Sequence, residues 1–317
     1  MTEALPLPKL PIGHYQLRFR AQDAVRLPPF AGSAWRGAFG QALKRLVCVT
    51  REPECAACLL YRSCTYPYIF ETPPDPAVGK LTRYTAAPHP FVLRPESGRQ
   101  GALTPGESLS LEMILFGQGN RLLPYVIHAL DRAGQRGLGA GQGRLHLFKV
   151  SQQDDASDWQ LLLTPGEPLR HWSAAERLPP PCPDAVTLIV ETPLRLKREE
   201  HFVTPETFGF GALFSNLLRR ISLLTAFHTD TPLETDFAGL TRAAQRIEPL
   251  KVELHWREWT RYSSRQETRL QMGGLLGEIV LSGPGLEPFW PYLWLGQWTH
   301  AGKGTSMGLG RYRVVVG

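Results

Sequence analysis

The same order of segments occurs twice along this 317-residue chain, and the repetition constrains the fold more than any other feature. Each half runs from an alternating apolar segment to an amphipathic helical segment, then to further alternating segments and a second helical segment. A glycine-rich loop then enters an apolar run, and Gly143-Arg144-Leu145 and Gly310-Arg311-Tyr312 stand at equivalent places. An internal duplication explains this order most economically, with chance resemblance between two α+β domains as the alternative.

The order within each half is typical of a ferredoxin-like (RRM-like) domain, an antiparallel sheet with two helices on one face and the other face available for RNA. The sequence therefore predicts an α+β chain of two tandem domains, at 1–150 and 185–317, joined by a proline-rich linker at 151–184. Expected strands are 15–20, 108–116, 144–148, 186–196, 249–262, 275–281 and 311–316, and expected helices are 33–47, 122–133, 208–228 and 286–298.

The last loop of the chain, at 300–311, carries groups that bind phosphate. Glycines adopt positive φ and let another backbone approach, basic side chains supply positive charge, and hydroxyls donate hydrogen bonds. An anionic polymer is therefore the expected ligand, with a plain hairpin connection as the alternative. The residues concerned are Gly302, Lys303, Gly304, Thr305, Ser306, Gly308, Gly310, Arg311 and Arg313.

Two nucleotide-binding motifs are excluded for this loop. Gly304 separates Lys303 from Thr305, whereas a P-loop places its lysine directly before the hydroxyl residue. The loop also precedes an expected strand, whereas the P-loop and the dinucleotide fingerprint both follow a strand and open a helix.

Composition bounds the class of protein. Hydrophobic residues at 43% and charged residues at 20% are typical of a globular chain. The net charge of +6 and the pI near 9.2 favour an anionic partner. No segment approaches the roughly 20 apolar residues that a membrane helix needs, and the N-terminal residues lack a leader pattern, so we expect a cytoplasmic protein that does not contact membranes.

Four of the five cysteines fall close together as Cys48, Cys55, Cys58 and Cys64, with the spacing C-x6-C-x2-C-x5-C. Four thiolates in a short loop suit a structural zinc site, and an iron-sulfur cluster is the second choice. Reduced, unliganded thiols or disulfides are the alternatives. The segment 48–64 is thus predicted to be a cysteine-rich, metal-binding insertion in the first domain.

Three segments carry a family resemblance: RGAFG at 36–40, CTYPYIFE at 64–71, and HAGKGTSMGLG at 300–310. Together with the order of elements, they resemble the CRISPR-associated endoribonucleases of the RAMP superfamily, which process precursor CRISPR RNA. The resemblance implies tandem ferredoxin-like domains that cut a CRISPR repeat without a metal. It implies attack by the ribose 2′-OH, giving 2′,3′-cyclic phosphate and 5′-OH ends. Expected partners are precursor and mature CRISPR repeat RNA and other CRISPR effector subunits.

The resemblance also raises the question of the catalytic histidine, which many family members carry in or beside the first helix. The expected helix at 33–47 contains none. His300 is the first candidate as acid or base, with capping of the preceding helix as its alternative role, and Lys303, three residues on, is the candidate catalytic cation beside it. His228 and His14 follow, each with a structural role as the alternative. Arg36, Lys44 and Arg45 on the first helix are candidates for charge stabilisation or RNA contact, or form a solvated face.

Further RNA contacts are expected on the strand at 249–262 and beyond it. Arginines at even spacing lie on one face of an uninterrupted strand, where guanidinium groups suit phosphates and bases. A turn near Ser263 would break that stripe. The residues are Arg257, Arg261, Tyr262, Arg265 and Arg269.

Two other functions remain open from the sequence. A noncatalytic RAMP subunit that holds RNA in an effector complex would explain the first helix without a histidine. A zinc-ribbon protein that binds duplex DNA is a weaker alternative suggested by the cysteines.

Overall fold

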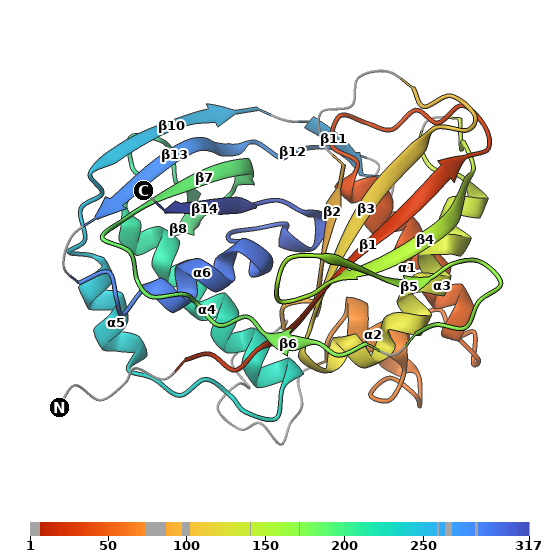
Figure 1. Ribbon diagram of the computed structural model, residues 1–317, viewed down its shortest axis with the longest axis horizontal. Helices are drawn as coiled ribbons and strands as arrows, with labels where there is room; N and C mark the ends of the chain where they lie inside the picture. Colours follow the sequence, from red (N-terminus) through yellow and green to blue (C-terminus); the bar gives the residue numbers. More distant parts are fainter. Residues whose placement is uncertain are drawn as a thin grey trace. The chain divides into compact units, whose positions relative to one another are not determined.

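The computed structural model describes residues 7–73, 87–96, 102–139, 141–170, 172–258, 260–263, 268–282 and 285–316. The chain divides into two compact units (Figure 1). The N-terminal unit comprises residues 10–176 and 226–230, and the C-terminal unit comprises 1–9, 177–225 and 231–317. No helix within the described part of the chain is long and apolar enough to cross a bilayer.

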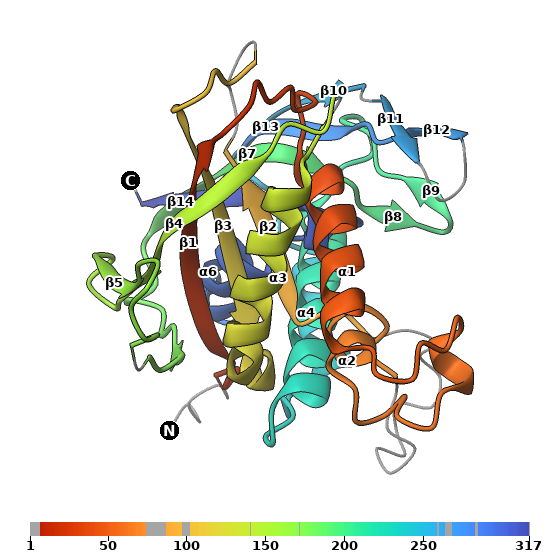
Figure 2. The same cartoon turned by 90° about the vertical axis from the view of Figure 1, so that its right-hand side faces the viewer.

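The sheet of the N-terminal unit has the strand order β2-β3-β1-β4-β5, with β6 pairing with β1 at its end. Every pairing in this sheet is antiparallel. Helices α1 and α3 lie side by side on one face (Figure 2). The strands are β1 (Pro11–Ala21), β2 (Phe91–Pro95), β3 (Ser108–Phe116), β4 (Leu145–Gln153), β5 (Trp159–Leu163) and β6 (Ala175–Glu176), and the helices are α1 (Gly32–Val47), η1 (Cys55–Ala57), α2 (Thr65–Phe70), η2 (Gly117–Leu122) and α3 (Leu123–Arg136).

Alternation along β1 sorts its side chains between the two faces of the sheet. Leu17 and Phe19 are fully buried, and Phe19 packs on Trp35 of α1 with ring centroids 5.0 Å apart. Burial of each such side chain stabilises the fold by about 1.5–3 kcal/mol. Arg18 and Arg20 point to the other face and are exposed.

The C-terminal unit repeats this arrangement with the strand order β10-β13-β7-β14. Phe214 of α4 packs edge-to-face on Phe289 and Tyr292, at 4.6 and 5.4 Å, and so joins α4 to the start of α6. The strands are β7 (Ala185–Leu194), β8 (Lys197–Arg198), β9 (His201–Phe202), β10 (Lys251–Arg257), β11 (Thr260–Ser263), β12 (Thr268–Gln271), β13 (Gly274–Ser282) and β14 (Tyr312–Val316), and the helices are α4 (Phe210–His228), α5 (Phe237–Ala244), α6 (Trp290–Thr299) and η3 (Thr305–Met307).

The two units share one topology. The first and third of their four common strands, β1 and β3 or β7 and β13, lie at the centre of each sheet. The two helices, α1 and α3 or α4 and α6, are the crossovers, and the last strand follows a glycine loop. This is the ferredoxin-like order, so the predicted tandem ferredoxin-like fold is confirmed.

Some elements differ from the expectation. Residues 151–184, expected to be a linker, contain β5 and β6, which pair with β4 and β1. Two strands, β10 and β11, stand where one strand was expected at 249–262. Strand β11 pairs antiparallel with β12, so the chain reverses direction between β11 and β12. This reversal ends the predicted uninterrupted arginine stripe after β11.

Candidate functional site

The glycine loop between α6 and β14 has the backbone geometry that its sequence predicted. Gly302, Gly304, Gly308 and Gly310 all have positive φ, at 82°, 81°, 91° and 70°. A Cβ on Gly310 would collide with the carbonyl oxygen of Ala301. Only glycine fits that position without moving the backbone.

Several amides of the loop are nevertheless bonded to neighbouring segments of the same unit rather than open to a phosphate. The Gly302 amide donates to Asn216 Oδ1 at 2.7 Å, the Lys303 amide to the Arg195 carbonyl at 3.0 Å, and the Gly310 amide to the Pro193 carbonyl at 3.0 Å. The Lys303 side chain is exposed. Lys303 is therefore the part of the loop that can meet a phosphate directly, whereas four other predicted contacts are buried: Thr305, Ser306, Gly308 and Gly310.

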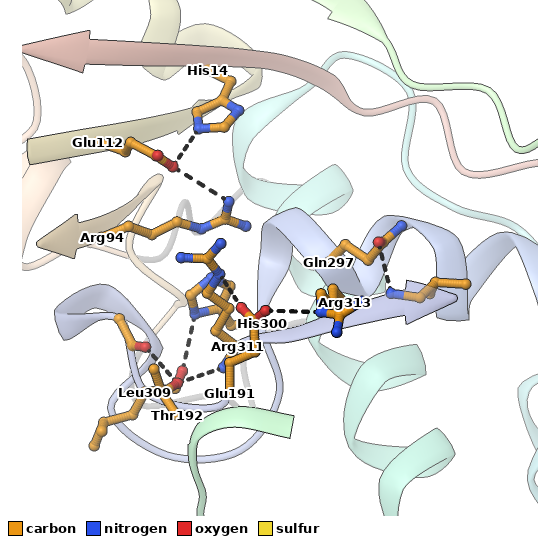
Figure 3. A network of polar contacts seen from close by, with 12 residues as sticks. His14, Arg94, Glu112, Glu191, Thr192, Gln297, His300, Leu309, Arg311 and Arg313 are labelled. Carbon is orange, nitrogen blue, oxygen red and sulfur yellow. Dashed lines mark hydrogen bonds and ion pairs between the residues drawn. The ribbon is translucent and has the colours of Figure 1, made fainter. Parts of the chain in front are cut away.

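His300, the first catalytic candidate, lies inside this loop with no exposed surface. Its φ of +58° turns the chain at the end of α6, and its amide donates to the Gly296 carbonyl at 2.8 Å. Its Nδ1 lies 3.1 Å from the Leu309 carbonyl oxygen (Figure 3). His300 thus ends the helix and links the two ends of the loop, which fits its alternative capping role, and its part in catalysis stays a prediction.

Arg311 and Arg313 of the same segment are joined to one carboxylate. Glu191 accepts from Arg311 Nε at 2.7 Å and from Arg313 Nε at 3.2 Å (Figure 3). Two cations on one anion leave a net positive charge beside the loop. Arg311 therefore contributes charge to this surface while its own hydrogen bond is already made within the protein.

His14 of β1, the third histidine candidate, is 5% exposed and holds strands together. One ring nitrogen lies 2.8 Å from Glu112 Oε2 of β3 (Figure 3). The other lies 2.8 Å from Gln153 Oε1 of β4. Burial, together with the nearby Arg94 guanidinium, lowers the pKa of His14 more than the Glu112 carboxylate and Gln153 raise it. Its contacts give it a structural role.

His228, the second candidate, is also fully buried. Its Nε2 donates to the Pro88 carbonyl at 2.8 Å, so its Nδ1 accepts from the Tyr68 hydroxyl at 3.0 Å. The ring therefore links α2 to the segment before β2, which fits its alternative structural role, and its part in catalysis stays a prediction.

The segment before β2 also places His89 against α1. The sequence pattern did not single out this histidine. His89 Nε2 lies 2.9 Å from Nη2 of Arg36. Arginine can only donate, so His89 Nε2 accepts and its ring is neutral in this arrangement. His89 thus brings a histidine to α1, a helix that contains none of its own.

The surroundings fix His89 in place. The carbonyl of Pro88 accepts from buried His228, and the carbonyl of Pro90 accepts from the Phe116 amide at 3.0 Å. The His89 ring stacks on Phe91 with centroids 5.7 Å apart. Arg36 lies over the ring of Phe70, 5.3 Å from its centroid. The His89–Arg36 pair therefore packs against the aromatic rings of Phe91 and Phe70, which hold both side chains in place.

Comparison with known proteins finds a family model for each half of the chain. A model of the AF_1859 N-terminal domain matches residues 10–176, and the model of the CRISPR-associated endoribonuclease Cas6 matches residues 188–312. The chain belongs to the AF_1859 family and carries a Cas6 domain. The resemblance to CRISPR-associated endoribonucleases is thereby confirmed, and the Cas6 domain places the chain among proteins that process or bind CRISPR RNA.

Solved Cas6 structures share the fold at low sequence identity. A Cas6 product complex is 18% identical with a TM-score of 0.56, covering 96% of this chain and 99% of that chain. Thermus thermophilus Cas6 is 16% identical with a TM-score of 0.53, covering 96% and 99%. A chain of a partial Cas6-RT-Cas1–Cas2 complex is 15% identical with a TM-score of 0.57, covering 98% of this chain and 47% of that chain.

One relative by sequence is an uncharacterized protein of Archaeoglobus fulgidus. It is 33% identical over 115 residues, and the match spans 36% of this chain and 37% of that protein. The likeness therefore concerns about a third of each protein.

The remaining predicted contacts lie on different elements. Lys44 of α1 donates to the Pro53 carbonyl at 2.9 Å and lies over the Tyr66 ring, and Arg45 is exposed on the same helix. Arg257 is exposed at the end of β10, within the Cas6 domain. Arg265 lies outside the described residues. Arg261 and Tyr262 lie on β11 and Arg269 lies on β12, where the backbone of Tyr262 pairs with that of Arg269.

A further basic and aromatic group lies on the face of the N-terminal sheet away from α1 and α3. Arg18 and Arg20 stand 5.6 and 4.9 Å from the ring centroid of Phe148. Alternating basic residues on β1 were visible in the sequence, but Phe148 of β4 joins them only through the fold. Guanidinium and aromatic groups on a sheet face suit RNA.

The predicted metal site at the four cysteines is not supported. They line one small cavity of about 20 Å³ between the end of α1 and the start of α2. Cys58 Sγ instead lies 3.2 Å from the Thr50 hydroxyl, and burial raises the pKa of the Cys55 thiol. Among the described residues no group of three or more His, Cys, Asp or Glu side chains is placed to hold a metal ion, so zinc is not supported.

Proposed function

We propose that this chain is a metal-independent endoribonuclease that cuts CRISPR repeat RNA into guide RNAs. The observation that carries the proposal is the Cas6 match over residues 188–312, which includes the glycine loop. The exposed Lys303 and the positive charge at Arg311 and Arg313 support an RNA ligand at this loop. The tandem ferredoxin-like fold supports the same ligand.

The chemistry we assign to the pair at α1 is transfer of the phosphate within the RNA. Neutral His89 takes the proton of a ribose 2′-OH on Nε2, and the 2′-oxygen attacks the adjacent phosphorus. Arg36 turns from His89 to the phosphate and stabilises the charge of the phosphorane. The bond from phosphorus to the 5′-oxygen breaks, and the leaving oxygen takes a proton from water. The products are a 2′,3′-cyclic phosphate and a 5′-OH.

The first test is incubation of the purified protein with end-labelled repeat RNA in EDTA. We expect cleavage at one position in the repeat, with a cyclic phosphate on the upstream product. The product end is read from its resistance to a phosphatase before acid treatment and its sensitivity afterwards. Cleavage that requires added Mg²⁺, or that leaves a 5′-phosphate, would refute the proposal.

The second test concerns His89. His89→Ala should lower the single-turnover cleavage rate about 100-fold or more, because a positioned acid or base contributes about 10²–10⁴-fold. RNA affinity should stay nearly unchanged. His128→Ala, an exposed histidine of α3, is the matched control. If His89→Ala cuts at the wild-type rate, His89 has no part in the reaction.

A second function is favoured by one observation about the histidines. His14, His228 and His300 are all buried, and α1 contains no histidine. A chain of this kind could hold CRISPR RNA for other CRISPR proteins without cutting it. Tight binding of repeat RNA that stays intact under every metal condition would support this function over the nuclease.

A further inference from the structure

A large polar cleft of about 700 Å³ opens on the C-terminal unit. Its walls are β8, the first three turns of α4, and the segment that follows α5. Three cationic side chains line it, against one acidic side chain among the described lining residues, Glu248. The cations are Lys197, Arg198 and Arg219.

The cleft is continuous with the glycine loop. Asn216 lines the cleft and also accepts the hydrogen bond from the Gly302 amide at 2.7 Å. The Lys303 amide bonds to the carbonyl of Arg195, two residues before Lys197. Lys197 pairs with Glu200 at 2.9 Å, and both Lys197 and, more weakly, Lys303 lower the pKa of that carboxyl. The exposed cation of the loop and the cations of the cleft therefore lie along one surface.

The lining fits a nucleic-acid strand better than a small apolar molecule. Clefts of roughly 300–1,000 Å³ hold ligands of drug size, which is about the size of one or two nucleotides. Lysine and arginine suit successive phosphates, and the half-buried ring of Phe208 offers a surface for a base. Stacking on such a ring requires a base that is not paired.

We propose that this cleft binds a single-stranded stretch of RNA that continues from the glycine loop. Lys197, Arg198 and Arg219 would contact phosphates there, and Phe208 would stack with a base. The inference rests on the proposed function, because it assumes that the loop holds repeat RNA. It adds a binding site whose residues stand 84 to 106 positions before Lys303 in the sequence.

The test compares RNA binding by the wild type with that by the double variant Lys197→Ala/Arg198→Ala and by Phe208→Ala. The control is Arg242→Ala, an exposed arginine of α5 that does not line the cleft. The probes are the repeat RNA as a single strand and the same RNA annealed to its complement. Affinity is measured over a range of salt concentrations, and circular dichroism checks that each variant is folded.

We expect the double variant to bind single-stranded RNA about tenfold more weakly, because it loses charged hydrogen bonds to phosphate. The negative slope of log affinity against log salt should become shallower by about 1–2, since each phosphate contact on a single strand contributes about 0.7 to its magnitude. Phe208→Ala should weaken single-strand binding without changing the slope. Binding of the annealed duplex should change little in either variant.

The outcomes separate this inference from the proposed function. If the wild type neither binds nor cuts repeat RNA, the proposed function fails. If the wild type does so and both cleft variants behave like Arg242→Ala, only the cleft assignment fails. Equal losses on single-stranded and duplex RNA would refute the single-strand assignment. If the double variant is unfolded, Lys197→Ala and Phe208→Ala alone decide the question in the same way.

Discussion

At the scale of single residues, His300 and His89 have surroundings that their places in the sequence do not reveal. His300 stands beside Lys303 in the chain, yet the positive φ at the end of α6 turns its ring inward to the Leu309 carbonyl. His89 reaches Arg36 from 53 positions away. Sequence spacing shows which residues are neighbours along the chain, but which side chains meet depends on turns that only tertiary packing fixes. The glycine geometry could be predicted, and the histidine contacts could not.

Two glycines test the loop geometry by substitution. Gly310→Ala should lower the free energy of unfolding by about 2–3 kcal/mol, because its φ is positive and a Cβ would meet the Ala301 carbonyl. Gly37→Ala is the control on α1, where a Cβ has open space, and it should raise stability by roughly 0.5–1 kcal/mol. Urea unfolding measures both. Equal effects would contradict the loop geometry.

The His14 site predicts a pH dependence. An unfolded histidine titrates near pH 6.5, and burial lowers the pKa of His14 in the folded chain. Between these two pKa values the unfolded chain binds more protons, so His14 destabilises the fold as the pH falls below about 6.5. An NMR titration of the imidazole should give a midpoint below 6.5, and a lower one in Glu112→Gln. A midpoint above 6.5 would show that Glu112 outweighs burial.

At the scale of elements, what could be predicted depends on how each strand or helix is buried. Strand β3 was expected at its observed bounds, whereas β1 was expected only at 15–20, because residues 12–15 of the observed Pro11–Ala21 are continuously buried and do not alternate. Strand β2 is buried along four consecutive residues and shows no alternation. Strand β5 lies in a polar, proline-rich passage, so its pairing with β4 depends on tertiary context that local pattern does not carry. The reversal between β11 and β12 was foreseen only as an alternative.

The link between α2, His228 and the segment before β2 should be sensitive to one hydroxyl. Tyr68→Phe removes the donor to His228 Nδ1 and leaves a buried acceptor without it. We expect a loss of about 1–2 kcal/mol in the free energy of unfolding. Tyr125→Phe, on the exposed surface of α3, should have no measurable effect. If the two variants unfold at the same urea concentration, the link does not stabilise the segment that carries His89.

At the scale of the whole molecule, the duplication read from the sequence is a duplication of topology. Both sheets have the same order and both final strands follow a glycine loop, at 137–144 and at 300–311. The assigned chemistry is not duplicated, because the neutral imidazole contacts α1 in the N-terminal unit, whereas the Cas6 match with its exposed lysine lies in the C-terminal unit. Sequence pattern predicts repeated architecture well, since periodicity reports burial, but it does not show where two units specialise.

The central claim is that the RNA supplies its own nucleophile. The most direct measurement is single-turnover cleavage, in EDTA, of a repeat RNA with a single 2′-deoxy substitution on the nucleotide 5′ of the cut. We predict that the substituted RNA binds as tightly as the unmodified RNA and is not cut, because the attacking 2′-oxygen is absent. Cleavage of the deoxy substrate at the same position and at a comparable rate would contradict the account.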